Sequence, residues 1–193
     1  MTIAATPLRA SWLMSFTGLI PLALTVPLLV LHLWSLGILV NGVGALLIIA
    51  FHLRRRQGIT GLDMLSLACA IANAVLYFGY HTTILLEHLD TVIYSLLAGQ
   101  VLYAQLRGEP WTTQFAKRAV APERWVTPEF LTANRLISLV WGACFLCCAG
   151  ASIWGRLGAW RTLIPAIMLV TTAVLTPRLA RWFGRRITGS TAS

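Results

Sequence analysis

The longest uncharged stretch is the feature that most constrains what this chain can fold into. From Ser11 to Leu53 the sequence runs for 43 residues without Asp, Glu, Lys or Arg. Four further uncharged stretches, of 23, 16, 20 and 16 residues, follow at Met64–Leu86, Thr91–Leu106, Leu136–Gly155 and Thr162–Pro177. A helix that crosses a bilayer needs about 20 mostly apolar residues. The lengths of these stretches therefore predict membrane-spanning segments. The segments are predicted to be helices and not strands, because the stretches lack the alternating pattern of a membrane β-barrel.

The composition excludes the common classes of soluble protein. Of the 193 residues, 58% are hydrophobic and only 11% are charged, whereas soluble domains are about 45–50% apolar and about 25% charged. A soluble chain of this size could not keep so much apolar surface from water. The net charge of +9 would suggest nucleic-acid binding in a soluble protein. In a membrane protein it is loop charge that fixes topology, so no nucleic-acid partner is expected.

We predict an all-α, polytopic transmembrane bundle that forms a single integral membrane domain over residues 1–193. About six spans are expected. Pro21 and Pro27 would kink the first one, so a short or re-entrant first helix with five full spans is the alternative. The six predicted spans are Thr17–Trp34, Leu36–Leu53, Leu62–Tyr80, Asp90–Leu106, Leu131–Ile153 and Trp160–Leu179.

The distribution of cations predicts the orientation of the chain. On the six-span arrangement only Arg156 and Arg161 fall on one side of the membrane. The other 13 lie on the opposite side: Arg9, Arg54, Arg55, Arg56, Arg107, Lys117, Arg118, Arg124, Arg135, Arg178, Arg181, Arg185 and Arg186. Cytoplasmic loops carry the excess of Lys and Arg. Both termini are therefore expected in the cytoplasm.

One turn contains residue types that can bind a metal. His81, Glu87, His88 and Asp90 lie between the third and fourth predicted spans, and imidazole and carboxylate are common ligands of zinc and iron. The two histidines are seven residues apart and no second cluster supplies further ligands. We interpret the segment as a hydrated external turn, with a metal or proton-relay site as the alternative.

Polar and thiol side chains within the spans have a packing interpretation and a chemical one. Cys144, Cys147 and Cys148 form a C-x-x-C-C pattern in an apolar run, where a reactive thiolate is disfavoured and small residues serve helix packing. The amides of Asn41, Asn73 and Gln100 are expected to bond between helices, and a substrate path is the alternative. No nucleotide, zinc-protease or hydrolase motif occurs. We therefore predict a non-enzymatic protein without a cofactor.

The stretch 107–135 predicts a cytoplasmic amphipathic loop. Pro110 suits the first turn of a short helix and Pro122 ends it. Thr127 is a typical N-cap residue, and Pro128 favours the first position of the next helix.

This loop holds the candidate interaction residues. Trp111 and Phe115 are four residues apart on one helical face, and Lys117 and Arg118 lie off that face. Such a helix places its apolar side in the acyl boundary and its cations among anionic headgroups, so the bilayer is one expected partner. A protein-docking face is the alternative. The candidate membrane- or partner-interface residues are Trp111, Phe115, Lys117, Arg118, Trp125 and Arg135.

Several blocks of sequence carry a resemblance to a known family. They are His52–Arg56, Asp63–Leu65, Asp90–Leu97, Gln114–Lys117, Trp125, Asn134–Arg135 and Trp141–Leu146. In these blocks the chain resembles the bacterial intracellular septation protein A-like family of inner-membrane proteins. Asp90 stands where that family has proline, and the cytoplasmic loop is longer than the family's.

The resemblance implies a multi-pass protein of the bacterial inner membrane with a structural or interaction role. Its expected roles are cell-envelope integrity, membrane homeostasis and cell division. Its expected partners are division or envelope-synthesis membrane proteins, or a second copy of the chain. A small transporter or lipid-handling protein is one alternative. An intramembrane metal-dependent enzyme that uses His81, Glu87 and His88 is another.

The cation distribution makes a testable prediction about topology. Reporter fusions at Arg56 and at Ser193 should both report the cytoplasm, and a fusion at Leu157 should report the outside, because 13 of the 15 cations lie on one side. A Ser193 fusion that reports the outside would require an odd number of spans between Arg56 and the C-terminus.

Overall fold

The computed structural model describes residues 20–56, 58–117, 120–154 and 160–190, and every regular element within them is helical. The predicted all-α class is confirmed for this part of the chain. Its contacts divide the chain into two compact units, Met1–His88 and Leu89–Ser193; the single integral membrane domain stays a prediction. The boundary follows the polar turn that contains His81, Glu87 and His88. Each unit is described by itself.

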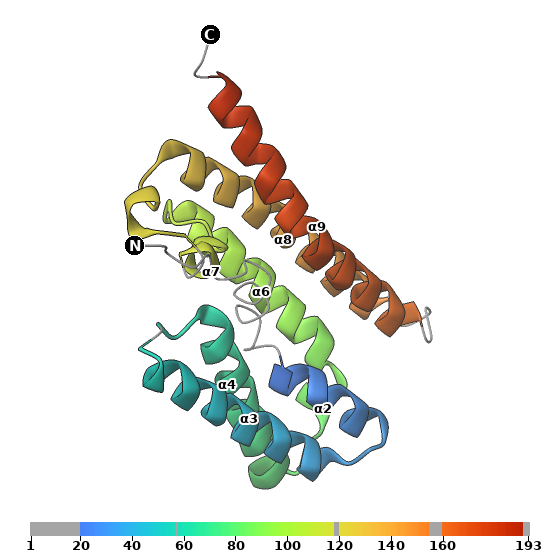
Figure 1. Ribbon diagram of the computed structural model, residues 1–193. Helices are drawn as coiled ribbons and strands as arrows, with labels where there is room; N and C mark the ends of the chain where they lie inside the picture. Colours follow the sequence, from blue (N-terminus) through green and yellow to red (C-terminus); the bar gives the residue numbers. More distant parts are fainter. Residues whose placement is uncertain (1–19, 57, 118–119, 155–159, 191–193) are drawn as a thin grey trace. The chain divides into compact units, whose positions relative to one another are not determined.

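The first unit consists mainly of two long helices, α3 (Trp34–Arg54) and α4 (Gly61–Ala74), and the shorter helix α2 (Ile20–Val30). It also contains the π-helix η2 (Val75–Gly79) and α5 (Ile84–Glu87). Helix α3 packs against both α2 and α4 (Figure 1).

Small residues let α2 approach α3 closely. A Cβ atom on Gly44 would lie 3.0 Å from Cβ of Pro21. The buried hydroxyl of Thr25 donates to the carbonyl oxygen of Pro21 at 2.8 Å and lies 3.3 Å from that of Gly37. The Thr25 hydroxyl therefore adds a polar contact between α2 and the backbone of α3.

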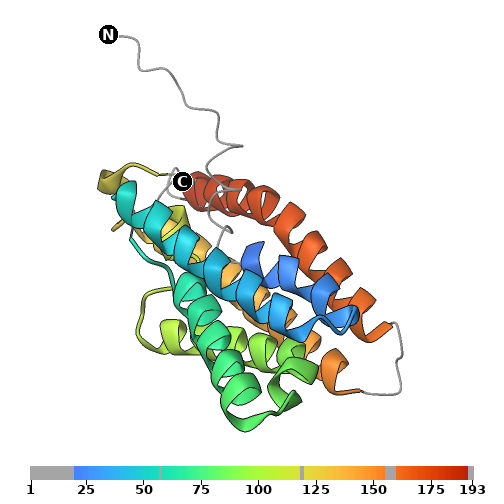
Figure 2. The same cartoon turned by 90° about the horizontal axis from the view of Figure 1, so that it is seen from below.

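The second unit is a layer of three helices with a folded loop on it. Its elements are α6 (Leu89–Leu106), α7 (Thr113–Ala116), the 3₁₀ helix η3 (Pro122–Arg124), α8 (Pro128–Ile153) and α9 (Trp160–Ser190). Helix α8 packs between α6 and α9, as Figures 1 and 2 both show. The predicted start of α8 is confirmed: Thr127 is its N-cap, the Thr127 hydroxyl accepts from the amide of Phe130, and Pro128 begins the helix.

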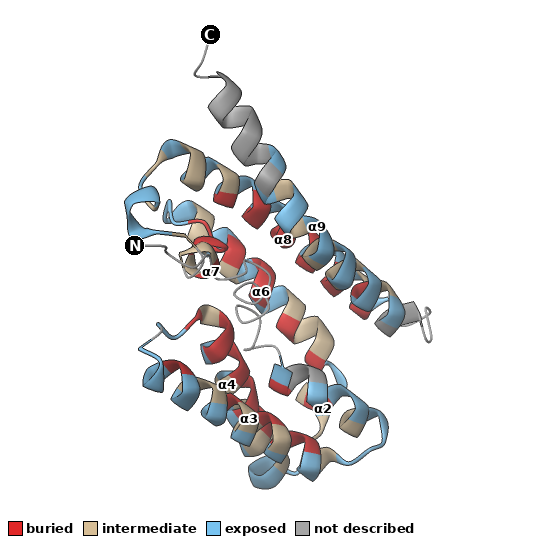
Figure 3. Ribbon diagram, in the orientation of Figure 1, coloured by how far each residue is buried: buried red, intermediate tan, exposed pale blue. Residues whose placement is uncertain are grey.

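Within residues 20–56, 58–117, 120–154 and 160–190, four helices are long and apolar enough to cross a membrane: Trp34–Arg54, Gly61–Gly79, Pro128–Ile153 and Leu163–Ala180. Large apolar side chains cover their outer surfaces, for example Leu47 on α3 and Leu146 on α8, which are 65% and 64% exposed. Figure 3 shows exposed positions along the outer side of α9 in particular. Such surfaces suit lipid rather than water, so the structure fits a membrane protein.

The first and fourth predicted spans differ from these four helices. Helix α2 has eleven residues, about 16 Å at 1.5 Å per residue, against a hydrocarbon core of about 30 Å. It fits the short first helix that the prolines suggested; residues 17–19 of the predicted span lie outside the described residues. Helix α6 has 18 residues and is not among the helices that are apolar enough to cross a membrane. The count of six spans stays a prediction.

The contact between α6 and α8 depends on a glycine. A Cβ atom on Gly142 would lie 3.0 Å from Cγ1 of Val101, whereas one on Gly150, two turns further along α8, would meet no atom within 4 Å. Replacing Gly142 by Leu should therefore destabilise the second unit by about 1–3 kcal/mol through overpacking. Gly150→Leu, the matched control with the same gain in helix propensity, should not.

The measurement is the unfolding free energy of the two variants in detergent micelles. Equal stability of Gly142→Leu and Gly150→Leu would show that α6 and α8 do not pack through Gly142.

Candidate functional site

The chain folds back on itself directly after α6. We call residues 110–116 the folded-back segment. The indole Nε1 of Trp111 donates to Oε1 of Gln100 at 3.4 Å. Gln100 lies six residues before the end of α6, which corresponds to about 9 Å along a helix. The segment therefore returns alongside α6 instead of leaving the bundle.

Thr112 fastens the folded-back segment to α8. Its backbone amide donates to Oγ of Ser138 at 3.0 Å, and its hydroxyl donates to the carbonyl oxygen of Asn134 at 2.9 Å. The same hydroxyl lies 3.1 Å from Oδ1 of Asn134 and 3.0 Å from Oγ of Ser138. All three residues are buried. The buried amide and hydroxyl of Thr112 thus find their partners inside the protein.

Four aromatic rings pack together beneath the segment. The Trp111 ring centroid lies 5.0 Å from that of Phe115, 5.6 Å from that of Phe145 and 6.3 Å from that of Trp141. Edge-to-face pairs of this kind contribute about 0.5–1.5 kcal/mol each beyond the area they bury. The indole of Trp141 donates to Oγ1 of Thr176 at 3.1 Å. The aromatic cluster therefore connects the segment, α8 and α9.

The structure places Trp111 and Phe115, which the sequence predicts at the membrane interface, among the buried side chains of the second unit. They are 5% and 7% exposed; the Trp111 ring contacts Trp141 and Phe145 of α8, and the Phe115 ring contacts that of Trp111. The helix is also shorter than predicted, because α7 covers only Thr113–Ala116. Helical spacing correctly placed the two rings on one face, but it could not show that α8 covers that face.

The other candidate interface residues lie around this segment. Nζ of Lys117 lies 5.6 Å from the centroid of the Trp125 ring, and the Trp125 indole donates to the carbonyl oxygen of Val120 at 2.8 Å. Arg135 is exposed, and its carbonyl oxygen accepts from Nε2 of Gln105 at 2.8 Å. Arg118 lies outside the described residues. A role of these residues at a membrane or partner interface stays a prediction.

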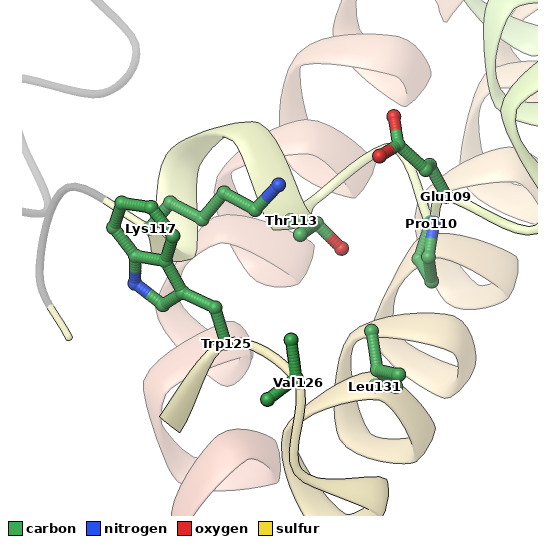
Figure 4. A pocket seen from close by; sticks show the side chains of 7 residues that line it. All are labelled: Glu109, Pro110, Thr113, Lys117, Trp125, Val126 and Leu131. Atoms are coloured by element: carbon green, nitrogen blue, oxygen red, sulfur yellow. The ribbon is translucent and has the colours of Figure 1, made fainter. Parts of the chain in front are cut away.

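A cleft of about 250 Å³ opens beside the segment. It is lined by Glu109, Pro110, Thr113, Lys117, Trp125, Val126 and Leu131 (Figure 4). The Thr113 side chain lies in it between Lys117 on one side and Glu109 with Pro110 on the other (Figure 4). Thr113 is 4% exposed, and its Oγ1 has no hydrogen-bond partner among the residues that the structure describes. The cleft thus combines two opposite charges, an unpartnered hydroxyl and an apolar wall.

The first unit holds a buried ionisable pair. Nδ1 of His52, near the end of α3, lies 3.0 Å from Oδ2 of Asp63, near the start of α4. Their side chains are 2% and 0% exposed. The amide and the hydroxyl of Thr60 both donate to the same Oδ2 at 2.8 Å. This junction joins two candidate membrane-spanning helices through side chains as well as through the connecting loop.

The sequence analysis did not predict the His52–Asp63 pair, although a local sequence signal for the position of Asp63 was present. Thr60-x-x-Asp63 before an apolar run is the pattern of a capping box, and the structure contains that box at the N-terminus of α4. Nothing local indicates that His52 approaches it. The second carboxylate oxygen, Oδ1 of Asp63, is buried and has no partner among the residues described, so the pair tightens the helix junction at a cost in desolvation.

The three amides of the proposed substrate path make internal contacts. Oδ1 of Asn41 accepts from Oγ of Ser66 at 3.2 Å, and Nδ2 of Asn73 donates to the carbonyl oxygen of Cys69 at 2.9 Å. Gln100 belongs to the other unit, where it binds Trp111. Asn41 therefore ties α3 to α4, as the packing interpretation predicted.

The candidate metal and thiol residues are placed as follows. His81, Glu87 and His88 are exposed, and Glu87 accepts a hydrogen bond from the hydroxyl of Thr83. In the described ranges no three His, Cys, Asp or Glu side chains lie close enough to hold a metal ion. Cys144 and Cys148 are buried within α8 and Cys147 is exposed, all as free thiols.

Comparisons of the chain with protein-family models, with curated proteins and with solved structures found no match.

The buried position of Trp111 makes a testable prediction. Trp111→Ala should lower the free energy of unfolding by about 3–5 kcal/mol, because it removes a ring that fills the core of the second unit. Trp154→Ala is the matched control. Trp154 is 66% exposed at the end of α8, and its loss should change the stability by at most about 0.5 kcal/mol.

Unfolding of the full-length variants in detergent micelles is the measurement. If Trp111→Ala is as stable as Trp154→Ala, the folded-back segment does not pack against α8, and the interface interpretation of Trp111 returns.

Proposed function

We propose that this protein is a multi-pass inner-membrane component of the bacterial cell envelope with a structural and interaction role. The observation that carries the proposal is the use of buried polar side chains as ties between neighbouring elements. Asn41 and Ser66 join α3 to α4, and Thr112 joins the folded-back segment to Asn134 and Ser138 on α8.

A structural role explains this pattern better than transport does. A carrier presents polar groups to a substrate within a cavity between its helices. The amides of Asn41 and Asn73 are at most 2% exposed and bond to groups of their own unit. Polar contacts of this kind fix the relative positions of helices and favour a rigid bundle.

The link to septation, envelope integrity and membrane homeostasis rests on the resemblance of the sequence blocks to the septation protein A-like family. Such a protein would act through membrane proteins of division or envelope synthesis, or through a second copy of itself. Exposed side chains on the cytoplasmic loop, with Arg135 among them, are the proposed contact points, and both termini would lie in the cytoplasm.

Deletion of the gene tests the proposed role. The deletion strain should form longer cells and become more sensitive to detergent, and the wild-type gene should restore both properties. Arg135→Glu should fail to restore them at equal membrane abundance, because it reverses a charge at the proposed contact surface. Arg178→Glu, an exposed cation on α9, is the control that should restore them.

Normal cell length and normal detergent resistance in the deletion strain, together with a lost solute uptake, would contradict the structural role and favour a carrier.

A further inference from the structure

We propose that the cleft beside the folded-back segment binds the headgroup of an ethanolamine phospholipid, a zwitterion with a primary ammonium and a phosphate diester. This inference needs a membrane location, but it does not depend on the role in the envelope proposed above. It rests on the charges, the unpartnered hydroxyl, the apolar wall and the position of the cleft.

The lining supplies one binding group for each part of the zwitterion. The carboxylate of Glu109 is exposed at the cleft and can accept hydrogen bonds from a primary ammonium. The ammonium of Lys117 and the hydroxyl of Thr113 line the same cleft and can both donate to phosphate oxygens. Glu109 and Lys117, both in the described part of the chain, form no ion pair with each other.

The hydroxyl of Thr113 favours the binding of an anion in the cleft. Its Oγ1 is buried and has no partner in the described part of the chain, and an unpaired buried hydroxyl is unfavourable. In Figure 4 the Thr113 side chain lies between Lys117 and Glu109, where a bound phosphate would meet both Lys117 and the hydroxyl. A phosphate oxygen would accept the proton that no protein group accepts.

The Trp125 ring argues for a primary amine over a quaternary one. Quaternary ammonium groups are bound by the open faces of aromatic rings. Nζ of Lys117 lies over one face of the Trp125 ring, 5.6 Å from its centroid, which places a positive charge beside the ring, and the indole N–H is engaged by Val120. The group of the cleft that can bind a ligand cation is the Glu109 carboxylate. It favours a primary ammonium over a quaternary one, because only the primary ammonium can donate hydrogen bonds.

Size and position favour a lipid headgroup over a larger solute. A cleft of about 250 Å³ is smaller than the pockets of about 300–1,000 Å³ that hold drug-sized ligands. Glu109 follows the last residue of α6 by three positions, and Leu131 is the fourth residue of α8, a candidate membrane-spanning helix. Val126 and Leu131 line the cleft and are 80% and 39% exposed, so they can contact the glycerol and the first acyl carbons.

The test is native mass spectrometry of the full-length protein in detergent with an equimolar mixture of phosphatidylethanolamine and phosphatidylcholine of identical acyl chains. The two lipids differ only in the three N-methyl groups that remove the hydrogen-bond donors. The wild type should retain the ethanolamine lipid about tenfold more than the choline lipid, the ratio expected for one charge-assisted hydrogen bond.

Matched variants separate the two halves of the site. Glu109→Gln should bring the retention ratio close to one. Lys117→Gln and Thr113→Val should lower the retention of both lipids, because both lipids share the phosphate. Thr113→Val should stay folded, since Oγ1 has no partner to lose. Glu123→Gln, an exposed loop carboxylate outside the cleft, is the control that should leave the ratio unchanged.

A wild-type ratio near one, or a preference that survives Glu109→Gln, would overturn the proposal. Free O-phosphoethanolamine distinguishes a lipid from a soluble ligand. It should displace the lipid only at far higher concentration than the lipid itself requires. If it binds while neither lipid is retained, the ligand is a soluble zwitterion and the lipid assignment is wrong.

Discussion

Hydrogen bonds between buried polar groups position the helices of both units, although Oδ1 of Asp63 and Oγ1 of Thr113 have no partner among the described residues. In the apolar part of a bilayer no water replaces a missing hydrogen bond, so an unpaired group is costly. His52 with Asp63 and Asn41 with Ser66 form such hydrogen bonds between α3 and α4. In the second unit, Thr112 forms the corresponding hydrogen bonds with Asn134 and Ser138 of α8. Each contact that satisfies a polar group also fixes where two elements touch, which is how a mostly apolar sequence specifies one arrangement.

Most helices could be predicted from the sequence because their signals are local. The uncharged stretches gave the approximate positions of α3, of α4 with its π-helical continuation, and of α6, α8 and α9. The N-terminus of α8 was predictable to the residue, since Thr127 and Pro128 act on the first turn alone. The prolines of the first stretch likewise indicated a short helix, and the observed length of α2 agrees with it.

The candidate site was predictable only in part, because its contacts join residues far apart in the chain. Spacing placed Trp111 and Phe115 on one face, but their cover comes from Trp141 and Phe145, which belong to a later helix. The approach of His52 to Asp63 depends in the same way on how the intervening loop folds. The spacing of apolar residues indicates which side chains share one face of a helix. It does not indicate which other helix packs against that face.

The folded-back segment has a consequence for the order in which the protein assembles during synthesis. Thr112 binds Asn134 and Ser138, which lie 22 and 26 residues later in the chain. At about 5–20 residues per second, the ribosome completes these partners about one to five seconds after Thr112 is made. During that interval Trp111 has no aromatic neighbours on α8. We expect α6 to settle first, and the segment to close onto the bundle only when α8 has emerged.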